Sequence, residues 1–419
     1  MSSEKSLTPQ IRFKGFTEAW EQRKLSELTT MHARIGWQNL RTSEFLDSGN
    51  YYLITGTDFE NGYVNLSTCH YVNKDRYDQD PNIQIDNGSI LITKDGTLGK
   101  VALVQGLDKP ATLNAGVFNV VIRNEEIVDN GYLYQYLKAP FLLNYVAQTA
   151  TGGTIKHLNQ SILVDFPVSM PSKGEQELIG DAFLRLDNLI TLHQRKLDAL
   201  KKIKSALLEK MFPKNGSNVP EIRFTGFTEA WEQRKLGDIA TKQTLKNTNS
   251  IIREPFTNSA EQGVVSQYDY FDHGITNVAN ISNYFVICPN DFVYNPRISV
   301  TAPCGPINRN RLNRPGIMSP LYTIFRTNQY IDVTYLEYYF KTKKWHPFMF
   351  LEGNTGARSD RFSISDSTFF KLPIQIPSKA EQKLISKQLE ALSNLITLHQ
   401  RKLDALKKIK SALLEKMFV

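Results

Sequence analysis

The chain has 419 residues, of which 41% are hydrophobic and 22% charged, a composition typical of globular proteins and unlike that of disordered or collagen-like chains. It contains no apolar run near the roughly 20 residues that a membrane helix needs. Its first residues, Met1 to Ser6, lack the apolar core of a signal peptide. We therefore expect roughly two to four folded units, no membrane partner and a cytoplasmic location.

The positive charge is concentrated in two segments. The net charge is +8, and residues 195–214 and 401–419 contribute +5 and +4 of it, so the rest of the chain sums to about −1. A net charge of this size is a weak indication of an anionic partner. The two basic segments are either solvated surfaces or docks for acidic partners or phosphates. The three cysteines stand singly, which supports neither a disulfide framework nor a zinc site.

An internal repeat organises the sequence. Residues 11–27 recur as residues 222–238 with 14 of 17 positions identical, and residues 171–212 recur as residues 377–418 with 33 of 42 identical. The second block includes an unbroken run of 25 identical residues from Asn188 and Asn394. Between the blocks the two halves share almost nothing. The chain is therefore a pseudo-two-fold internal repeat of one unit, with a shared frame and a different interior in each copy.

The shared C-terminal block predicts a long helix. Residues 175–212 contain no proline, a single glycine and many residues that favour helix. Their apolar positions alternate at spacings of 4 and 3, which is a heptad seam. The histidines in this seam lack ligand companions at metal spacing and are predicted to pack. The predicted seam residues are Leu186, Ile190, His193, Leu197, Leu200 and Leu207 in the first copy and Leu392, Ile396, His399, Leu403, Leu406 and Leu413 in the second.

Connectivity predicts how the two helices pair. The termini of a compact domain usually lie close together, so the second helix starts near the end of the first and returns beside it. We expect an antiparallel two-helix coiled coil. Its 38 residues would give a spacer of fixed length, roughly 57 Å at 1.5 Å per residue.

The interiors are predicted to be α/β. Residues 89–93, 117–122, 291–294 and 321–325 are short β-rich runs bounded by turn residues, and residues 132–138 and 335–341 are predicted to be helical. The expected fold class is a mixed α+β fold, with two α/β domains separated by the long antiparallel coiled coil. The predicted divisions are 1–172 for the first domain, 173–213 for the first spacer helix, 214–376 for the second domain and 377–419 for the second spacer helix.

Loops rich in Gly, Thr, Asn, Lys and Arg join these elements, at residues 32–38, 94–100, 151–157, 295–299 and 353–361. Such loops can bring backbone N–H groups, amides and guanidinium groups onto phosphates and base edges. Ordinary turn chemistry is the alternative interpretation of each loop. The predicted DNA contacts are Arg34, Trp37, Gln38, Lys94, Thr97, Lys100, Lys156 and His157 in the first domain and Arg297, Arg358, Ser359 and Arg361 in the second.

Enzyme motifs are incomplete in this chain. Residues 96–100 lack the earlier glycine and the following Ser or Thr of a phosphate loop. Residues 295–298, Asn-Pro-Arg-Ile, depart from the Asn-Pro-Pro-aromatic tetrad of adenine methyltransferases at two positions. Glu381 and Lys383 have nuclease-like spacing, but the matching Glu175 begins a helix, where acidic residues favour the helix dipole. We expect no catalytic residue and no metal site.

The complete pattern closely resembles the specificity subunit of type I restriction-modification enzymes. The resemblance rests on two different domains, each framed by Arg-Phe-x-Gly-Phe with Trp-Glu-Gln-Arg-Lys-Leu and by the Pro-Ser-Lys-x-Glu-Gln helix, and it covers essentially the whole chain. Loops 34–37 and 93–100 are similar to those of target-recognition domains. The resemblance implies that each domain reads one half of a split site in double-stranded DNA. It also implies that the helices bind two modification subunits.

The same resemblance assigns the chemistry to those partners. Modification subunits would carry S-adenosylmethionine and the catalytic tetrad, and two restriction subunits would supply translocation and cleavage with ATP and Mg. This chain would carry no cofactor. Each half-site would contain an adenine that is flipped into the partner.

A rigid rod suits this mechanism independently of the resemblance. Half-sites read from one face of DNA lie about 34 Å apart, and different interiors predict unrelated halves and an asymmetric target. Two other classes stay open from the sequence: a non-enzymatic coiled-coil scaffold that displays two different protein-binding domains, and a self-contained DNA enzyme.

Overall fold

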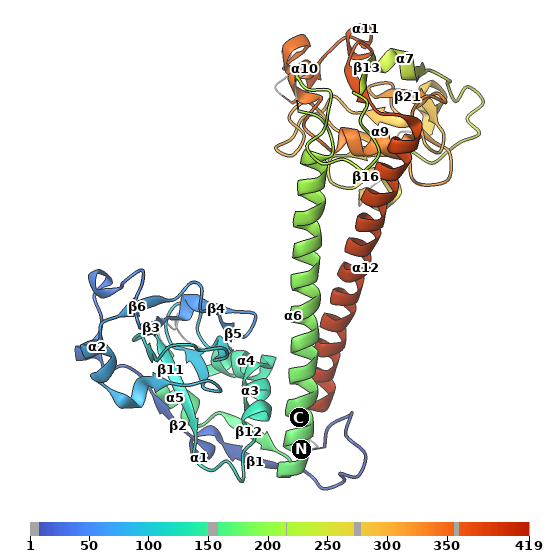
Figure 1. Ribbon diagram of the computed structural model, residues 1–419. Helices are drawn as coiled ribbons and strands as arrows, with labels where there is room; N and C mark the ends of the chain where they lie inside the picture. The colour runs from blue at the N-terminus through green and yellow to red at the C-terminus, as the bar shows by residue number, and fades with distance from the viewer. Residues whose placement is uncertain (1–7, 150–157, 215, 272–277, 356–359, 419) are drawn as a thin grey trace. The chain divides into compact units, whose positions relative to one another are not determined.

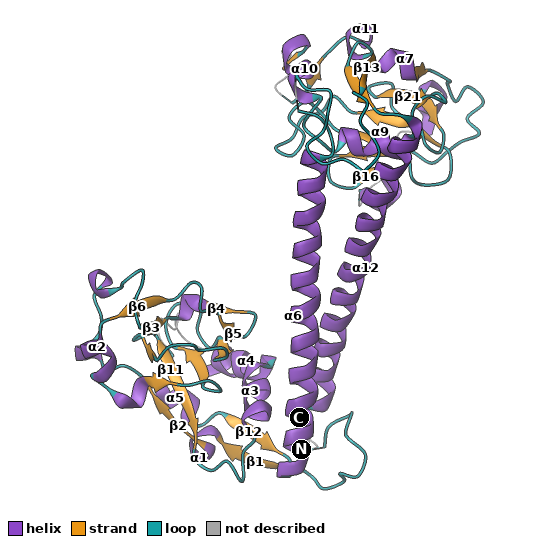
Figure 2. Ribbon diagram, viewed as in Figure 1, coloured by secondary structure: helices purple, strands orange, loops and turns teal. Residues whose placement is uncertain are grey.

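The computed structural model describes residues 8–149, 158–214, 216–271, 278–355 and 360–418 (Figure 1). The chain forms two compact units. Unit 1 comprises Met1–Gln194 together with Arg401–Val419, and unit 2 comprises Arg195–Gln400. Each of the two long helices, α6 (Lys173–Lys210) and α12 (Lys379–Met417), therefore contributes one end to each unit (Figure 2).

The described part of unit 1 contains two larger sheets, with strand orders β2-β11-β8-β9-β5-β4 and β6-β3-β10-β7, and a two-stranded sheet of β1 and β12. All their pairings are antiparallel except β3 with β10 and β5 with β9. The strands are β1 (Glu21–Lys24), β2 (Thr29–His32), β3 (Tyr51–Ile54), β4 (Phe59–Glu60), β5 (Tyr63–Val64), β6 (His70–Val72), β7 (Gln84–Ile85), β8 (Ile90–Thr93), β9 (Val101–Leu103), β10 (Ala111–Leu113), β11 (Val117–Ile122) and β12 (Pro167–Met170). The shorter helices are α1 (Leu25–Leu28), α2 (Lys74–Asp78), α3 (Asn130–Lys138), α4 (Pro140–Thr149) and α5 (Gln160–Val164).

Unit 2 repeats the central part of this topology, with strand order β14-β21-β18-β19 where unit 1 has β2-β11-β8-β9. The strands are β13 (Glu232–Lys235), β14 (Ala240–Gln243), β15 (Phe256–Ser259), β16 (Gly263–Ser266), β17 (Phe285–Ile287), β18 (Phe292–Tyr294), β19 (Ile307–Arg309), β20 (Gly316–Met318), β21 (Thr323–Thr327), β22 (Asn354–Thr355), β23 (Phe362–Ser363) and β24 (Pro373–Ile376). The shorter helices are α7 (Leu236–Ile239), α8 (Gln267–Tyr270), α9 (Val333–Phe340), α10 (His346–Glu352) and α11 (Asp366–Phe369). The predicted strands and helices of both interiors are confirmed.

The two long helices run antiparallel within each unit. In unit 1 the start of α6 meets the end of α12: Phe183 stacks on Phe418 with ring centroids 5.5 Å apart, and Asp187 pairs with Lys410. In unit 2 the end of α6, with Met211 and Phe212, shares a buried cluster with Ile385 and Leu389 at the start of α12. The predicted antiparallel pairing is therefore confirmed in both units.

The predicted seam residues are the covered ones. All twelve are buried or half-buried, with Leu197 and Leu403 each 1% exposed. Lys204 and Lys410 interrupt the seam for a reason that the sequence did not reveal. Each lysine lies beside its unit's interior helix, Lys204 over the ring of Tyr338 in α9 and Lys410 against Asp187 close to α3.

The shared N-terminal block is fastened to the start of each long helix by a buried carboxylate. Arg12 donates to both oxygens of Glu175 at 2.7 and 2.9 Å, and the Trp20 indole N–H donates to Glu175 at 3.2 Å. In unit 2 Arg223 binds Glu381 in the same bidentate way. Both glutamates lie in the first turn, as predicted, but their carboxylates form ion pairs in addition to any effect on the helix dipole.

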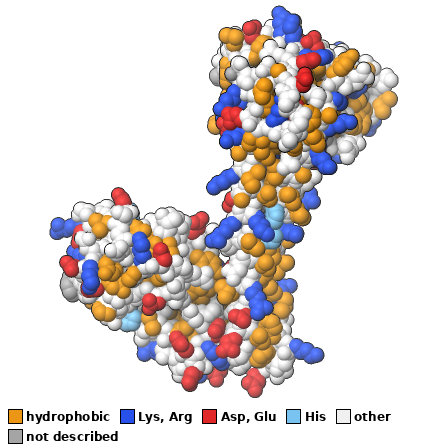
Figure 3. All heavy atoms as spheres, viewed as in Figure 1, with side chains coloured by type: hydrophobic (Ala, Val, Ile, Leu, Met, Phe, Trp, Pro, Cys, Tyr) orange, Lys and Arg blue, Asp and Glu red, His pale blue; other side chains and the backbone are white. Residues whose placement is uncertain are grey.

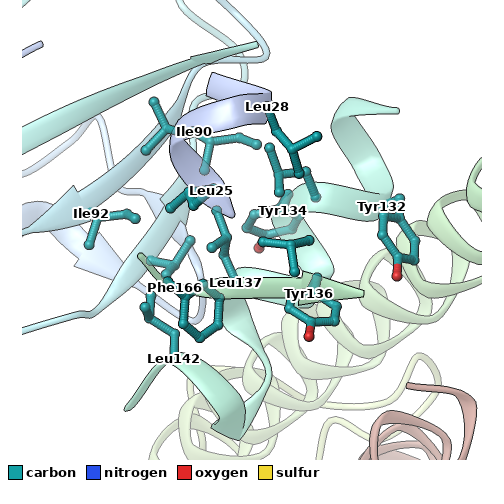
Figure 4. Packing of buried hydrophobic residues seen from close by; sticks show 14 of the residues in the cluster. Leu25, Leu28, Ile90, Ile92, Tyr132, Tyr134, Tyr136, Leu137, Leu142 and Phe166 are labelled. Atoms are coloured by element: carbon teal, nitrogen blue, oxygen red, sulfur yellow. The ribbon is translucent and has the colours of Figure 1, made fainter. Parts of the chain in front are cut away.

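The core of unit 1 lies between the six-stranded sheet and helix α3. Figure 4 shows Tyr134 and Leu137 of α3 pointing toward Leu25, Leu28 and Ile90. Asp129 precedes helix α3 and caps it, because its side chain accepts a hydrogen bond from the Tyr132 N–H. Helix α3 is therefore packed between the sheet and the long helix α6.

Two lysines share one carboxylate at this joint. Lys410 Nζ lies 2.5 Å and Lys138 Nζ 3.4 Å from Asp187, which is 8% exposed at its side chain. Because one anion cannot compensate two buried cations, one lysine loses its proton more easily than usual. Burial, together with the charge of Lys410, lowers the pKa of Lys138 to about 8.

A pH dependence of stability follows from Lys138. Between about pH 8 and 10.5 the unfolded chain keeps a proton on Lys138 that the folded chain has lost, so the free energy of unfolding should rise with pH in this window. The Lys138→Met variant should lack this rise. Denaturant unfolding of both proteins from pH 7 to pH 11 measures the difference, and parallel curves would contradict the prediction.

Candidate nucleic-acid interface

Unit 1 has a hollow of about 540 Å³ at the end of strand β8. Lys94, which follows β8, is held there by its backbone: its N–H donates to Gly116 O at 2.9 Å, and its carbonyl accepts from Leu158 N at 2.7 Å. Its ammonium lies 5.5 Å from the centroid of the Phe118 ring. The hollow is lined by the end of β2, the turn at residues 80–82, the loop that follows β8 and the start of α5. Its side chains include His32, Asn82, Asn159 and Gln160.

The predicted loop 94–100 closes on Thr93. Thr93 Oγ1 accepts from Lys100 N at 2.9 Å, and Gly99 N donates to Thr93 O at 2.9 Å. Gly96 and Gly99 both have φ of +73°, a left-handed conformation that favours glycine. Thr97 is exposed at the loop tip, whereas Lys100 directs its ammonium to the carbonyl of Phe59. Lys94 and Thr97 are therefore available to a ligand, and Lys100 is tied to the domain.

Arg34 and Gln38, two of the predicted DNA contacts, are buried. Arg34 is 2% exposed; its Nε donates to Leu113 O at 2.9 Å and its Nη2 to Thr112 Oγ1 at 3.3 Å. Gln38 is 5% exposed. Burial lowers the pKa of Arg34, since desolvation penalises its charge. This geometry argues against direct DNA contact by either residue, and it makes Arg34 a support beneath the 35–38 loop.

Unit 2 has a hollow of about 680 Å³ at the end of strand β18. Its rim carries Arg297 and Arg361, whose backbones form an antiparallel bridge. Two further hydrogen bonds, Ile298 N to Asp360 O at 3.0 Å and Phe362 N to Pro296 O at 2.8 Å, fix this arrangement. The Arg297 side chain is 68% exposed, with Nη2 3.8 Å from Asp360. Both arginines are therefore available to a ligand.

Asn295, the first residue of the tetrad-like sequence, has a structural role. Its side-chain amide donates to Asn258 O at 2.9 Å, and its side-chain oxygen accepts from Arg297 N at 3.0 Å. The amide therefore positions the strand end and the arginine beside it.

Four predicted contacts, Lys156, His157, Arg358 and Ser359, lie outside the described residues, as does the side chain of Trp37. The prediction for these residues is unchanged. Sequence reasoning missed Asn82, Asn159 and Gln160 in the first hollow and Tyr270 and Tyr322 in the second. Asn82, Tyr270 and Tyr322 stand in stretches without basic clusters or Gly-rich patterns. Asn159 and Gln160 lie just beyond the predicted loop 151–157, so a wider boundary for that loop could have included them.

The two hollows share part of their setting. Each is lined by the loop that follows the matching strand, β8 or β18, and by a segment that precedes α5 or α11. Residues from 31–35 and 80–82 complete the first hollow, and residues from 257–271 and 319–322 complete the second. Their linings mix cationic, amide and acidic side chains, a set that can match donors and acceptors on base edges. Two unlike hollows on one duplicated frame fit a class of protein that recognises two different ligand elements, as bipartite DNA readers do.

Comparison with known proteins agrees with this class. The chain belongs to the family described as the type I restriction modification DNA specificity domain, whose model matches residues 17–202 and 228–408. It is 23% identical over 415 residues to the putative type I restriction enzyme MjaX specificity subunit of Methanocaldococcus jannaschii, covering 95% of this chain and 92% of that protein. It is 21% identical over 434 residues to the MjaVIII specificity subunit of the same organism, covering 94% and 95%.

The fold is likewise similar to a solved one. The crystal structure of the type I restriction-modification S subunit from M. genitalium matches with a TM-score of 0.62 and 14% identity, covering 98% of this chain and 99% of that one. At this identity the likeness concerns the fold alone. Family membership makes the chain a non-catalytic DNA-recognition subunit and supports this interpretation over the protein-binding scaffold.

No helix in the described part of the chain combines the length and apolarity required to cross a bilayer.

Proposed function

We propose that unit 1 and unit 2 each read one half of an asymmetric, split target in double-stranded DNA. The observation that carries this proposal is that each of two interiors that differ in sequence has a hollow beside the loop that follows the matching strand, β8 or β18. A hollow at the matching strand end suits two half-sites read in related geometry, and unlike linings suit unrelated half-site sequences. The antiparallel helices would set the gap between the half-sites.

The contacts that support this proposal are Lys94 and Thr97 in unit 1 and Arg297 and Arg361 in unit 2. Their side chains are half-buried or exposed at a hollow or on its loop. An arginine can bind guanine through two hydrogen bonds, which is worth about 1–3 kcal/mol of discrimination against the wrong base. A lysine can donate to the same guanine acceptors, and we assign this role to Lys94.

The test is the DNA motif that this subunit confers. The chain is co-produced with a type I modification subunit, and adenine methylation in host DNA is mapped by single-molecule sequencing. We expect a split motif with unrelated halves. Arg361→Ala should relax one half, with about 5- to 150-fold weaker discrimination at one position, while the other half stays unchanged.

Lys94→Ala should affect only the opposite half of the motif. Lys202→Ala, at an exposed position of α6, is the control and should leave the motif intact. If Arg361→Ala and Lys94→Ala altered the same half, the assignment of one half to each unit would be wrong.

We further propose that two modification subunits dock on exposed apolar side chains of the long helices. Figure 3 shows hydrophobic side chains exposed along these helices. In unit 1 they are Leu178, Leu189 and Leu192 of α6 and Ile409 of α12; in unit 2 they are Leu384, Leu395 and Leu398 of α12 and Ile203 of α6, each 40–49% exposed. Because the residues are the same in both units, two equivalent sites are expected. S-adenosylmethionine would bind in these partners, and two restriction subunits would bring ATP and Mg. The whole assembly would act on DNA in the cytoplasm.

The docking proposal predicts a change in stoichiometry. Leu189→Asp with Leu192→Asp should remove one modification subunit from the complex, because charges in an apolar interface are strongly unfavourable. Leu395→Asp with Leu398→Asp should remove the other. Native mass spectrometry measures the subunit count, and full occupancy in both variants would contradict the proposal. Lys196→Asp with Lys201→Asp, at exposed α6 positions, controls for added negative charge.

A further inference from the structure

The two long helices differ in sequence only near their N-terminal ends. Residues 171–212 differ from residues 377–418 at nine positions, all between Gly174 and Asp187, whereas residues 188–212 are identical to residues 394–418. If the helices acted only as a spacer, the differences would have no reason to gather in this segment, because the heptad seam continues beyond it in both helices.

Four of the nine positions lie on the helix face that contacts the interior of the helix's own unit. They are Gly180, Phe183, Leu184 and Asp187 in α6 and Ser386, Leu389, Glu390 and Ser393 in α12. Spacings of 3, 1 and 3 place them on one helix face. The other five positions are exposed or half-buried in α6.

The first of these positions meets the cap of the interior helix. A Cβ atom on Gly180 would lie 2.7 Å from Asp129 Oδ1 and 2.8 Å from Tyr132 N, so unit 1 requires glycine there. In unit 2 the equivalent Ser386 donates its hydroxyl to Asp332 Oδ1 at 2.7 Å. Asp129 and Asp332 are the N-caps of α3 and α9. The long helix therefore meets the N-cap of the interior helix through a different residue in each unit: a glycine that leaves room in unit 1 and a serine that donates a hydrogen bond in unit 2.

The last position shows the same matching. Asp187 accepts hydrogen bonds from Gln135 at 3.0 Å and Tyr63 at 3.2 Å, besides pairing with Lys138 and Lys410. Its counterpart Ser393 hydrogen-bonds the Tyr338 hydroxyl at 2.8 Å.

Position 184 contributes a specific contact in unit 2. Glu390, which stands where unit 1 has the half-buried Leu184, accepts from Arg311 at 2.9 Å. The start of each long helix thus carries side chains that match the contacts available in its own unit.

The opposing helix does not distinguish the units. Lys204, Met211 and Phe212 of α6 are identical to Lys410, Met417 and Phe418 of α12. Phe212 packs on Tyr335 as Phe418 packs on Tyr132. Among the residues of the two long helices, those that differ between the units therefore lie only at the start of the long helix that follows each interior.

We propose that these four positions on each helix are positioning residues specific for their own recognition domain. The exchangeable unit of this protein then ends after Asp187 or Ser393, fourteen residues or more into the helix, and not at the helix start. This inference goes beyond the proposed function, because it concerns how a recognition domain is held and not what it reads.

The first test exchanges the four residues in the full chain: Gly180→Ser, Phe183→Leu, Leu184→Glu and Asp187→Ser. We expect the Tm of unit 1 to fall by on the order of 10 °C, because two buried lysines lose their carboxylate and a Cβ clashes with α3. The matched control exchanges four outward positions: Glu177→Lys, Asp181→Lys, Ala182→Gln and Arg185→Ala. Its Tm should change by about 2 °C or less. Equal shifts in both variants would overturn the proposal.

The second test moves a whole domain. In one chimera residues 11–170 replace residues 222–376; in the other, residues 11–187 replace residues 222–393. The longer graft joins within the identical run and should melt on the order of 10 °C higher. Equal melting, or a more stable short graft, would overturn the proposal. If neither chimera folds, the four-residue exchange decides.

Unfolding of the purified chains needs no DNA, so this result stands apart from the proposed function. Under that function the folded longer chimera should also direct methylation at a target with two identical half-sites, and failure of this readout alone would count against the function.

Discussion

Replacing Phe418 with alanine should destabilise unit 1 by about 3–5 kcal/mol. The ring is 4% exposed, and its centroid lies 5.6 Å from Tyr132, 5.5 Å from Tyr136 and 5.5 Å from Phe183. Removing it leaves a cavity among aromatic rings that α3 and α6 hold in place. Denaturant unfolding followed by circular dichroism measures the loss.

Two variants control this prediction. Phe212→Ala removes the equivalent ring, which is 1% exposed beside Trp231, Tyr335 and Tyr339, and should destabilise unit 2 by a similar amount. Leu192→Ala, at a side chain that is 46% exposed, should cost less than about 1 kcal/mol. If Phe418→Ala behaved like Leu192→Ala, the role assigned to the end of α12 would be wrong.

Replacing Glu175 with alanine should cost unit 1 about 3–5 kcal/mol. The Glu175 side chain is 0% exposed, and its loss leaves the Arg12 guanidinium, 12% exposed, without its carboxylate. The Trp20 indole N–H loses its acceptor in the same variant. Thermal or denaturant unfolding measures the effect. Glu175→Gln should lie between alanine and the native protein, since it keeps an acceptor but no charge.

The neighbouring glutamate provides the control for this variant. Glu177→Ala removes an exposed carboxylate of the same helix, 3.9 Å from Lys173, and should change stability by less than about 1 kcal/mol. A loss as large for Glu177 as for Glu175 would show that helix-end charge, and not the buried ion pair, dominates.

The candidate site illustrates where sequence reasoning stops. The loop after β8 could be identified from its Gly, Lys and Thr content, and Lys94 and Thr97 lie at or near a hollow. Arg34 has the same composition-based signal, yet it is buried against Leu113 and Thr112. Composition indicates which groups a loop contains, but the direction of each side chain depends on strands that are distant in sequence.

The sequence by itself determined the duplicated frame, the long helices and their antiparallel return, and the family. Helix periodicity and repeat identity are local or pairwise properties of the chain, so they can be read without coordinates. The interiors, which share almost no identity, nevertheless contain the same four-strand order, and only the tertiary structure revealed this. The reason is that strand pairing and burial depend on contacts between distant segments, which different side chains can satisfy equally well. The same reason explains Lys204 and Lys410, which interrupt the apolar seam in the sequence. In the structure Lys204 lies over the ring of Tyr338, and Lys410 pairs with Asp187.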